Sequence, residues 1–160
     1  SLGEELCNEM EKIDYLFVAV STCGTLAGTS QKIKEQFPNC KIIAVDIVGS
    51  QIFEQSNRKK HISGIGTGMI PQNLMHAKYD DYMIIEEVDA ISECNRLLSK
   101  GIAVGASSGA VAYAIQNYTG YSGDIESRKV VGIFPDRGER YLDTIYDKEW
   151  CNKIDVGILK

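Results

Sequence analysis

The sequence contains no hydrophobic run long enough to cross a membrane as a helix, and its N-terminus lacks the basic stretch and apolar core of a signal peptide. It is also short of positive charge, because 17 Lys and Arg stand against 22 Asp and Glu, for a net charge of −5. Nucleic acids and anionic membranes require clustered positive charge, so this balance argues against both as partners. We expect a cytoplasmic protein that binds neither.

The sequence also lacks the residue patterns that usually bind metals or form disulfide frameworks. The five cysteines form no C-x-x-C pair, and an odd number cannot pair completely. The only two histidines, His61 and His76, are well separated in the sequence. Neither a disulfide framework nor a zinc site is predicted.

The size of the chain indicates one folding unit. Its 160 residues, with 44% hydrophobic and 24% charged side chains, have the composition of a single globular domain with one core. The chain begins at Ser1 and not at a methionine. We therefore expect residues 1–160 to be a single lobe cut from a longer protein of two domains.

The most informative stretch runs from Tyr15 into a helix that ends near Phe37. Tyr15 to Val20 is a continuous apolar run, typical of a strand buried on both faces of a parallel sheet. Further on, Leu26, Ile33 and Phe37 mark one face of a helix. Between strand and helix lie five small residues, Ser21, Thr22, Cys23, Gly24 and Thr25. This order predicts a phosphate-binding loop.

Such a loop would bind phosphate through free backbone N–H groups and the positive end of the helix dipole. Ser21, Thr22 and Thr25 add hydroxyl donors, and Gly24 lets phosphate oxygens approach the backbone. An ordinary N-cap is the alternative. The loop is neither a P-loop nor the G-x-G-x-x-G fingerprint. Asp46, at the end of the next strand, keeps open a non-catalytic module that binds a nucleotide or another anion.

The remaining apolar runs repeat the pattern of strand followed by helix. Mainly parallel strands are expected near residues 14–20, 41–46, 82–86, 103–106 and 129–134. A short amphipathic helix is expected before the first strand, over residues 3–12. Together these elements predict an α/β fold, with a mainly parallel twisted sheet and helices on both faces.

Candidate ligand groups gather in three loops, Ser21–Thr25, Ala106–Gly109 and Pro135–Tyr141. Each follows a predicted strand, and open parallel sheets bind ligands at the carboxyl ends of their strands. Residues 64–71 are rich in glycine and have no strand signal. We expect them to form a long irregular segment, of a kind that is usually functional in compact domains.

Taken together, these segments resemble the C-terminal half of cysteine synthase and its relatives, the fold-type II pyridoxal-phosphate enzymes. The resemblance covers Gly3 to about Trp150. Four motifs in order carry it: Ser-Thr-Cys-Gly-Thr at 21–25, Gly-Ile-Gly at 64–66, Gly-Ala-Ser-Ser-Gly at 105–109 and Pro-Asp-Arg-Gly-Glu-Arg-Tyr at 135–141. The resemblance implies the larger-lobe portion of such an enzyme, with pyridoxal 5'-phosphate as cofactor and a small amino-acid substrate.

The resemblance also implies a role for each motif. The phosphate of the coenzyme would be held by Ser21, Thr22, Cys23, Gly24 and Thr25. Ser107 would form a hydrogen bond with the pyridine nitrogen, and Asp136 would lie near the pyridine edge. On the substrate side would lie Gly64, Ile65, Gly66 and Arg137. A neutral hydroxyl at the ring nitrogen makes the coenzyme a moderated electron sink, suited to β-elimination and β-replacement.

Three positions depart from the family pattern, because Ser21 and Cys23 replace glycines and Arg137 replaces a serine. Cys23 is either a small side chain that fills a glycine site or a thiol of lowered pKa that acts as a redox sensor. Arg137 either holds an anionic group of the substrate or pairs with Asp136 or Glu139.

The same motifs are most similar to the siderophore-pathway branch of the family, which combines Ser-Thr-x-Gly-Thr with Pro-Asp-Arg-Gly-Glu-Arg-Tyr-Leu-Asp. That branch includes the synthase that joins phosphoserine and glutamate into N-(2-amino-2-carboxyethyl)-glutamate. A cysteine synthase that uses O-acetylserine is the alternative.

The Schiff-base lysine of the family is missing from this chain. In the family it lies in the N-terminal half, in an Asn-Pro-x-Gly-Ser-x-Lys-x-Arg setting, and nothing here has that form. The substrate-carboxylate loop is missing as well. We therefore expect no catalytic residue in this chain and no activity from it alone. The resemblance implies an N-terminal half as its partner and a homodimer for the full-length protein.

Overall fold

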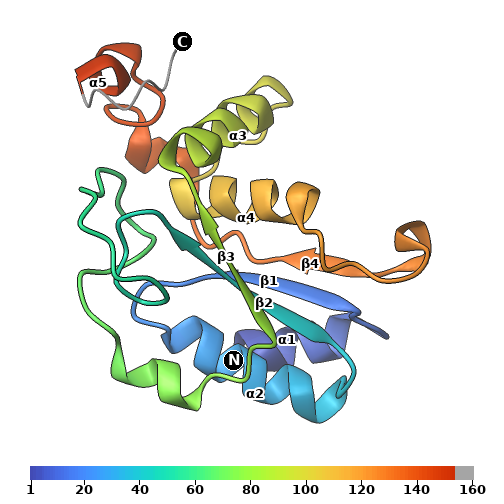
Figure 1. Cartoon of the computed structure of the whole chain (residues 1–160). Coiled ribbons are helices and arrows are strands. Elements are labelled where there is room, and N and C mark those ends of the chain that lie inside the picture. Colours follow the sequence, from blue (N-terminus) through green and yellow to red (C-terminus); the bar gives the residue numbers. More distant parts are fainter. Residues whose placement is uncertain (154–160) are drawn as a thin grey trace.

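A four-stranded parallel sheet lies at the centre of the computed structural model, which describes residues 1–153 (Figure 1). The strands are β1 (Tyr15–Ala19), β2 (Lys41–Ile47), β3 (Asp81–Ile85) and β4 (Val130–Gly132), in the spatial order β3-β2-β1-β4. β1 pairs with β2 from Tyr15 opposite Lys41, and with β4 from Tyr15 opposite Val130. The predicted fold class is confirmed.

Helices cover both faces of this sheet (Figure 1). α1 (Leu2–Glu9) and α2 (Gly24–Gln36) lie on one face, and α3 (Glu87–Ser99) and α4 (Ala106–Asn117) lie on the other. Short elements complete the described chain: η1 (Gln72–His76), η2 (Ile125–Ser127), η3 (Gly138–Tyr141) and α5 (Lys148–Lys153).

Alternation along the central strands builds two hydrophobic cores. In β1, Phe17 packs toward α3 and α4, whereas its neighbours Leu16 and Val18 pack toward α1 and α2. β2 does the same, with Val45 in the first core and Ala44 in the second. Successive strand residues point to opposite faces, so a strand covered on both faces must be apolar throughout. This explains the unbroken apolar run that predicted β1.

The N-terminal helix, α1, begins with a capping box, which is formed by the Ser-x-x-Glu pattern of residues 1–4. The Ser1 side chain accepts a hydrogen bond from the Glu4 amide at 3.4 Å, and the Glu4 carboxylate accepts one from the Ser1 amine at 2.6 Å. The first of these bonds satisfies an amide that has no partner within the helix. The helix ends at Glu9, earlier than the predicted Lys12.

The strand predicted at 103–106 is wrong. Val104 forms only an isolated antiparallel bridge with Arg137, and α4 already begins at Ala106. The backbone N–H and C=O of Val104 both bond to the Tyr146 hydroxyl, at 3.1 and 2.6 Å. Because a side chain satisfies these groups, Val104 needs no strand partner.

No helix within residues 1–153 is long and apolar enough to cross a membrane. The longest of them, α2 and α3, have 13 residues each.

Truncating Phe17 to alanine should destabilise the chain by about 3–5 kcal/mol, because its fully buried ring packs edge-on against Tyr118 with ring centroids 5.5 Å apart. Phe134→Ala is the matched control, and it should cost about 1 kcal/mol or less because Phe134 is 43% exposed. Urea unfolding followed by circular dichroism measures both losses. Equal losses would contradict the assignment of Phe17 to the core.

Candidate functional site

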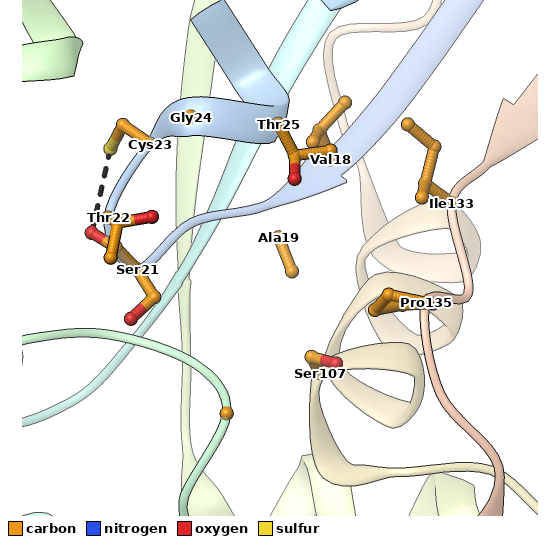
Figure 2. Close-up of a pocket in the computed structure, with 11 residues that line it drawn as sticks. Val18, Ala19, Ser21, Thr22, Cys23, Gly24, Thr25, Ser107, Ile133 and Pro135 are labelled. Carbon is orange, nitrogen blue, oxygen red and sulfur yellow. Dashed lines mark hydrogen bonds between the residues drawn. The ribbon is translucent and has the colours of Figure 1, made fainter. Parts of the chain in front are cut away.

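A cleft of about 200 Å³ opens where β1 and β4 end. The chain leaves β1 through α2 to reach β2 on one side, and β4 lies on the other side of β1. This is the switch point at which open parallel sheets bind ligands. The cleft is lined by Val18, Ala19, Ser21, Thr22, Cys23, Gly24, Thr25, Gly64, Ser107, Ile133 and Pro135 (Figure 2).

The start of α2 forms one wall of this cleft. No side chain caps the helix, and its first turn contains no acidic residue. The amides of residues 24–26 therefore lack the cap that would satisfy them, and the helix dipole adds positive potential. Thr22 and Thr25, both exposed, add hydroxyl groups to the same wall. This donor set suits a phosphate dianion.

Cys23 is buried under this wall. Its side chain is 2% exposed, and its thiol points to the Ser21 carbonyl oxygen at 3.8 Å (Figure 2). Burial, with a smaller contribution from the charge of Asp46, raises the pKa of the Cys23 thiol to about 11. The alternative of a thiol with a lowered pKa is therefore wrong. A small side chain that fills a glycine site fits the burial.

The backbone at Cys23 adopts a conformation that favours glycine. Its φ is 59°, in the left-handed region, and it is the only non-glycine residue with positive φ within residues 1–153. This conformation costs an L-residue about 1–2 kcal/mol. The turn from β1 into α2 imposes it, whatever the residue.

The glycine-rich segment is hydrogen-bonded directly to the predicted phosphate-binding loop, Ser21–Thr25, and to the residue before it. The Gly66 amide donates to the Val20 carbonyl at 2.7 Å, and the Ser21 hydroxyl donates to the Gly66 carbonyl at 3.2 Å. Gly66 has φ of 68°, and a Cβ there would lie 2.7 Å from Ile47 Cγ2. Only glycine fits. The Ser21 hydroxyl hydrogen is used in the bond to Gly66. A phosphate could therefore accept a hydrogen bond from Ser21 only through the backbone amide.

Of the three predicted substrate-side residues in this segment, only Gly64 lines the cleft. Ile65 is fully buried in the core beneath α3 and α4, and Gly66 is buried by the contacts above. Asn73 was not predicted, and nothing in its sequence context signals it. Its side-chain amide donates to the Thr22 carbonyl at 3.1 Å and supports the loop from η1.

The opposite wall comes from the start of α4 and the chain after β4. Ser107 lies in the first turn of α4, and it faces the loop together with Pro135 and Ile133 (Figure 2). Ser107 is 3% exposed in the whole protein, so its hydroxyl is reached only through the cleft. A neutral hydroxyl in this position can share a hydrogen bond with a ring nitrogen.

Asp136 and Arg137 do not line the cleft themselves. Asp136 accepts a hydrogen bond from the Tyr141 hydroxyl, and its second oxygen, Oδ1, is buried without a partner. A Cβ on Gly105 would lie 2.3 Å from this oxygen, so the carboxylate packs directly against the start of α4. Arg137 is exposed and takes part in none of the ion pairs formed within residues 1–153. The alternative in which it pairs with Asp136 or Glu139 is wrong.

Asp46 lies outside the cleft, on the α2 face of the sheet. Its carboxyl group is 1% exposed and accepts a hydrogen bond from the Ile47 amide at 2.9 Å, while Oδ2 is buried without a partner. Burial raises the pKa of this carboxyl group. The side chain is not accessible to a ribose, which weakens the nucleotide alternative.

Metal chemistry has no support in the described part of the chain, where no three His, Cys, Asp or Glu side chains gather to hold an ion. The lining of the cleft, by contrast, suits an aromatic phosphate ester. The start of α2 would hold its anion, and Ser107, on the other side of the space in Figure 2, would meet its ring. The residues present therefore fit pyridoxal phosphate.

Known proteins are similar to this chain in sequence and in fold. Residues 1–136 match the family described as pyridoxal-phosphate dependent enzyme. The chain is 36% identical over 154 residues to N-(2-amino-2-carboxyethyl)-L-glutamate synthase of Ralstonia nicotianae, covering 95% of this chain and 45% of that protein. The synthase of the same name from Cupriavidus metallidurans is 36% identical over 155 residues, with the same coverage.

Solved structures agree with these sequence matches. O-acetylserine dependent cystathionine beta-synthase from Helicobacter pylori is 30% identical and superimposes with a TM-score of 0.82, over 92% of this chain and 48% of that one. O-ureido-L-serine synthase is 25% identical with a TM-score of 0.81, over 92% and 48%. The chain thus spans about half the length of the relatives that it matches. It belongs to the family of pyridoxal-phosphate dependent enzymes, within the fold-type II group of cysteine synthase.

Proposed function

We propose that this chain is the lobe that binds the coenzyme phosphate and pyridine ring in a β-replacement enzyme acting on O-acetylserine or O-phosphoserine. The observation that carries the proposal is the cleft at the switch point, with the uncapped start of α2 on one wall and Ser107 on the other. When bound, pyridoxal phosphate supplies the electron sink for β-elimination and β-replacement.

The residues of this chain bind and orient the coenzyme. The backbone amides of the Ser21–Thr25 loop, with the hydroxyls of Thr22 and Thr25, hold the phosphate. Ser107 shares a hydrogen bond with the pyridine nitrogen, and Asp136 supports the start of α4 on which Ser107 lies. Gly64 leaves room for the substrate beside the ring, because it has no side chain and lines the cleft.

The substrate is proposed to be an activated serine, and the acceptor an amino acid as in the siderophore-pathway branch. The relatives named N-(2-amino-2-carboxyethyl)-L-glutamate synthase support this choice. Arg137 is an exposed cation two residues after Pro135, which lines the cleft, so it is available to hold an anionic group of a substrate. An O-acetylserine-dependent synthase is the second candidate, supported by the similar Helicobacter pylori structure.

The Schiff-base lysine is proposed to come from an N-terminal half outside these residues. No lysine lines the cleft among residues 1–153. Ser-x-Lys occurs at residues 30–32 and 127–129; Lys32 lies in α2 and pairs with Glu35 at 3.1 Å. The full-length protein would be a cytoplasmic homodimer whose second lobe closes over the cleft.

Thr25→Glu should weaken the binding of pyridoxal phosphate at least about tenfold, because it places a negative charge beside the proposed phosphate position. Titration followed by the absorption band of the coenzyme measures the dissociation constant. Thr119→Glu makes the same substitution at an exposed residue after α4 and should leave it unchanged. Unchanged affinity in Thr25→Glu would remove the loop from the site.

The chain alone should bind pyridoxal phosphate weakly and reversibly. Borohydride reduction followed by peptide mapping should find no stoichiometric adduct at any one lysine, because none lines the cleft among residues 1–153. No β-replacement should be detected with O-acetylserine or O-phosphoserine until the N-terminal half is added. A single labelled lysine such as Lys32, together with turnover, would instead indicate a complete small enzyme.

Cys23 should be a poor nucleophile. Measuring its reactivity distinguishes the proposed coenzyme-binding lobe from a thiol sensor, which would need a reactive Cys23. Its pKa of about 11, against 9.0 for a free thiol, reduces the thiolate fraction at pH 8 about 100-fold. Iodoacetamide should therefore modify it at least that much more slowly in the folded chain than in urea, at a rate that rises with pH up to 11. Mass spectrometry of the Cys23 peptide reads the rate. Equal rates in folded and unfolded chain would restore the sensor hypothesis.

A further inference from the structure

The segment that leads into Gly64 is held by a buried glutamate at the start of α3. Glu87, the first residue of α3, is 4% exposed. Its Oε1 accepts hydrogen bonds from the backbone amides of His61 at 2.6 Å and Ile62 at 2.8 Å. Its Oε2 lies 2.8 Å from His61 Nδ1. Both oxygens thus contact residues 61–62, Oε1 at two backbone amides and Oε2 at the His61 ring.

The two oxygens of Glu87 make all three contacts, and the tautomer of His61 sets which of Oε2 and Nδ1 carries the hydrogen between them. A carboxylate accepts at both oxygens, whereas a glutamine has one acceptor oxygen and a donor NH₂ group. The contacts also offset the cost of burying the charge, and hydrogen bonds to an ionised acceptor are stronger than neutral ones. The position at the first turn of α3 adds the favourable dipole of that helix. Glu87 is therefore a specific anchor for residues 61–62.

The anchored stretch continues directly into the cleft wall. Gly64 lines the cleft two residues after Ile62, and Gly66 is then bonded to Val20 and Ser21. Ile62 and Ile65 are buried in the core beneath α3. The backbone at Gly64 is thus held from α3 on one side and from the phosphate-binding loop on the other.

We propose that Glu87 is the positioning residue of the substrate-side wall, a role that rests on the function proposed above. The coenzyme phosphate and ring contact the loop at α2 and Ser107, which Glu87 does not touch. Loss of the Glu87 anchor should therefore weaken the binding of the amino-acid substrate and leave coenzyme affinity almost unchanged. A residue that only stabilised the fold would weaken both.

The neighbouring residue Glu86 provides a matched control. It forms a two-bond ion pair with Arg58 at 2.8 and 2.9 Å, but the two side chains are 44% and 57% exposed. Exposed ion pairs contribute little to stability. Glu86→Gln removes the same charge one residue away, with the same isosteric change as Glu87→Gln.

The first measurement needs neither coenzyme nor activity. In the coenzyme-free protein, Glu87→Gln should increase the hydrogen exchange rate of the His61 and Ile62 amides at least about tenfold, because both amides bond to Oε1 and a neutral amide oxygen is a weaker acceptor than a carboxylate oxygen. Glu86→Gln should leave both rates unchanged. Equal protection of these amides in the two variants would overturn the anchor.

The second measurement uses the full-length protein reconstituted with pyridoxal phosphate. Glu87→Gln should raise the half-saturating concentration of the activated serine at least about tenfold, read from the coenzyme absorption band, and change the coenzyme dissociation constant less than about twofold. His61→Ala removes only the ring contact, so it should produce a smaller shift of the same kind should Glu87→Gln fail to fold.

The outcomes separate this inference from the proposed function. Substrate affinity equal to that of Glu86→Gln, or a parallel loss of coenzyme and substrate affinity, would overturn the positioning role alone. A parent protein that binds no pyridoxal phosphate would overturn the proposed function, and this inference with it.

Discussion

The structure depends on the pairing of β1 at both of its edges. β1 is covered by helices on both faces, so its backbone groups can be satisfied only by neighbouring strands. β2 and β4 provide these partners in parallel, one on each side. The carboxyl end of β1 consequently lies at the switch point of the sheet, with β2 and β3 on one side and β4 on the other. The cleft opens there.

The same end of β1 creates the local strain and the close contacts of the site. The turn into α2 needs a left-handed residue, which Cys23 provides at a cost that glycine would avoid. Gly66 lies so close to Ile47 and Ser50 that no side chain fits. These constraints bring the backbones of two segments that are 40 or more positions apart into direct hydrogen bonding, as between the Gly66 amide and the Val20 carbonyl. A rigid wall of free amides results.

The polar groups around the cleft divide into those that face it and those that support it. Thr22, Thr25 and Ser107 line it. Asp136 and Glu87 lie behind the walls, the first against the start of α4 and the second against residues 61–62. In the sequence, Asp136 is conspicuous because it belongs to a motif, whereas Glu87 looks like one acidic residue among several at a helix start.

The sequence by itself determined the parallel α/β fold and predicted the loop that forms one wall of the cleft, because these rest on local patterns: the apolar run of β1 and the small residues that follow it. It also identified Ser107 and Gly64 through their motifs. Only the tertiary structure decided that Ile65 belongs to the core, that Val104 is no strand, and that the Cys23 thiol has a raised pKa. Each of these depends on groups distant in the chain, such as Tyr146 for Val104 and the packing that buries the Cys23 thiol, and no local pattern encodes such contacts.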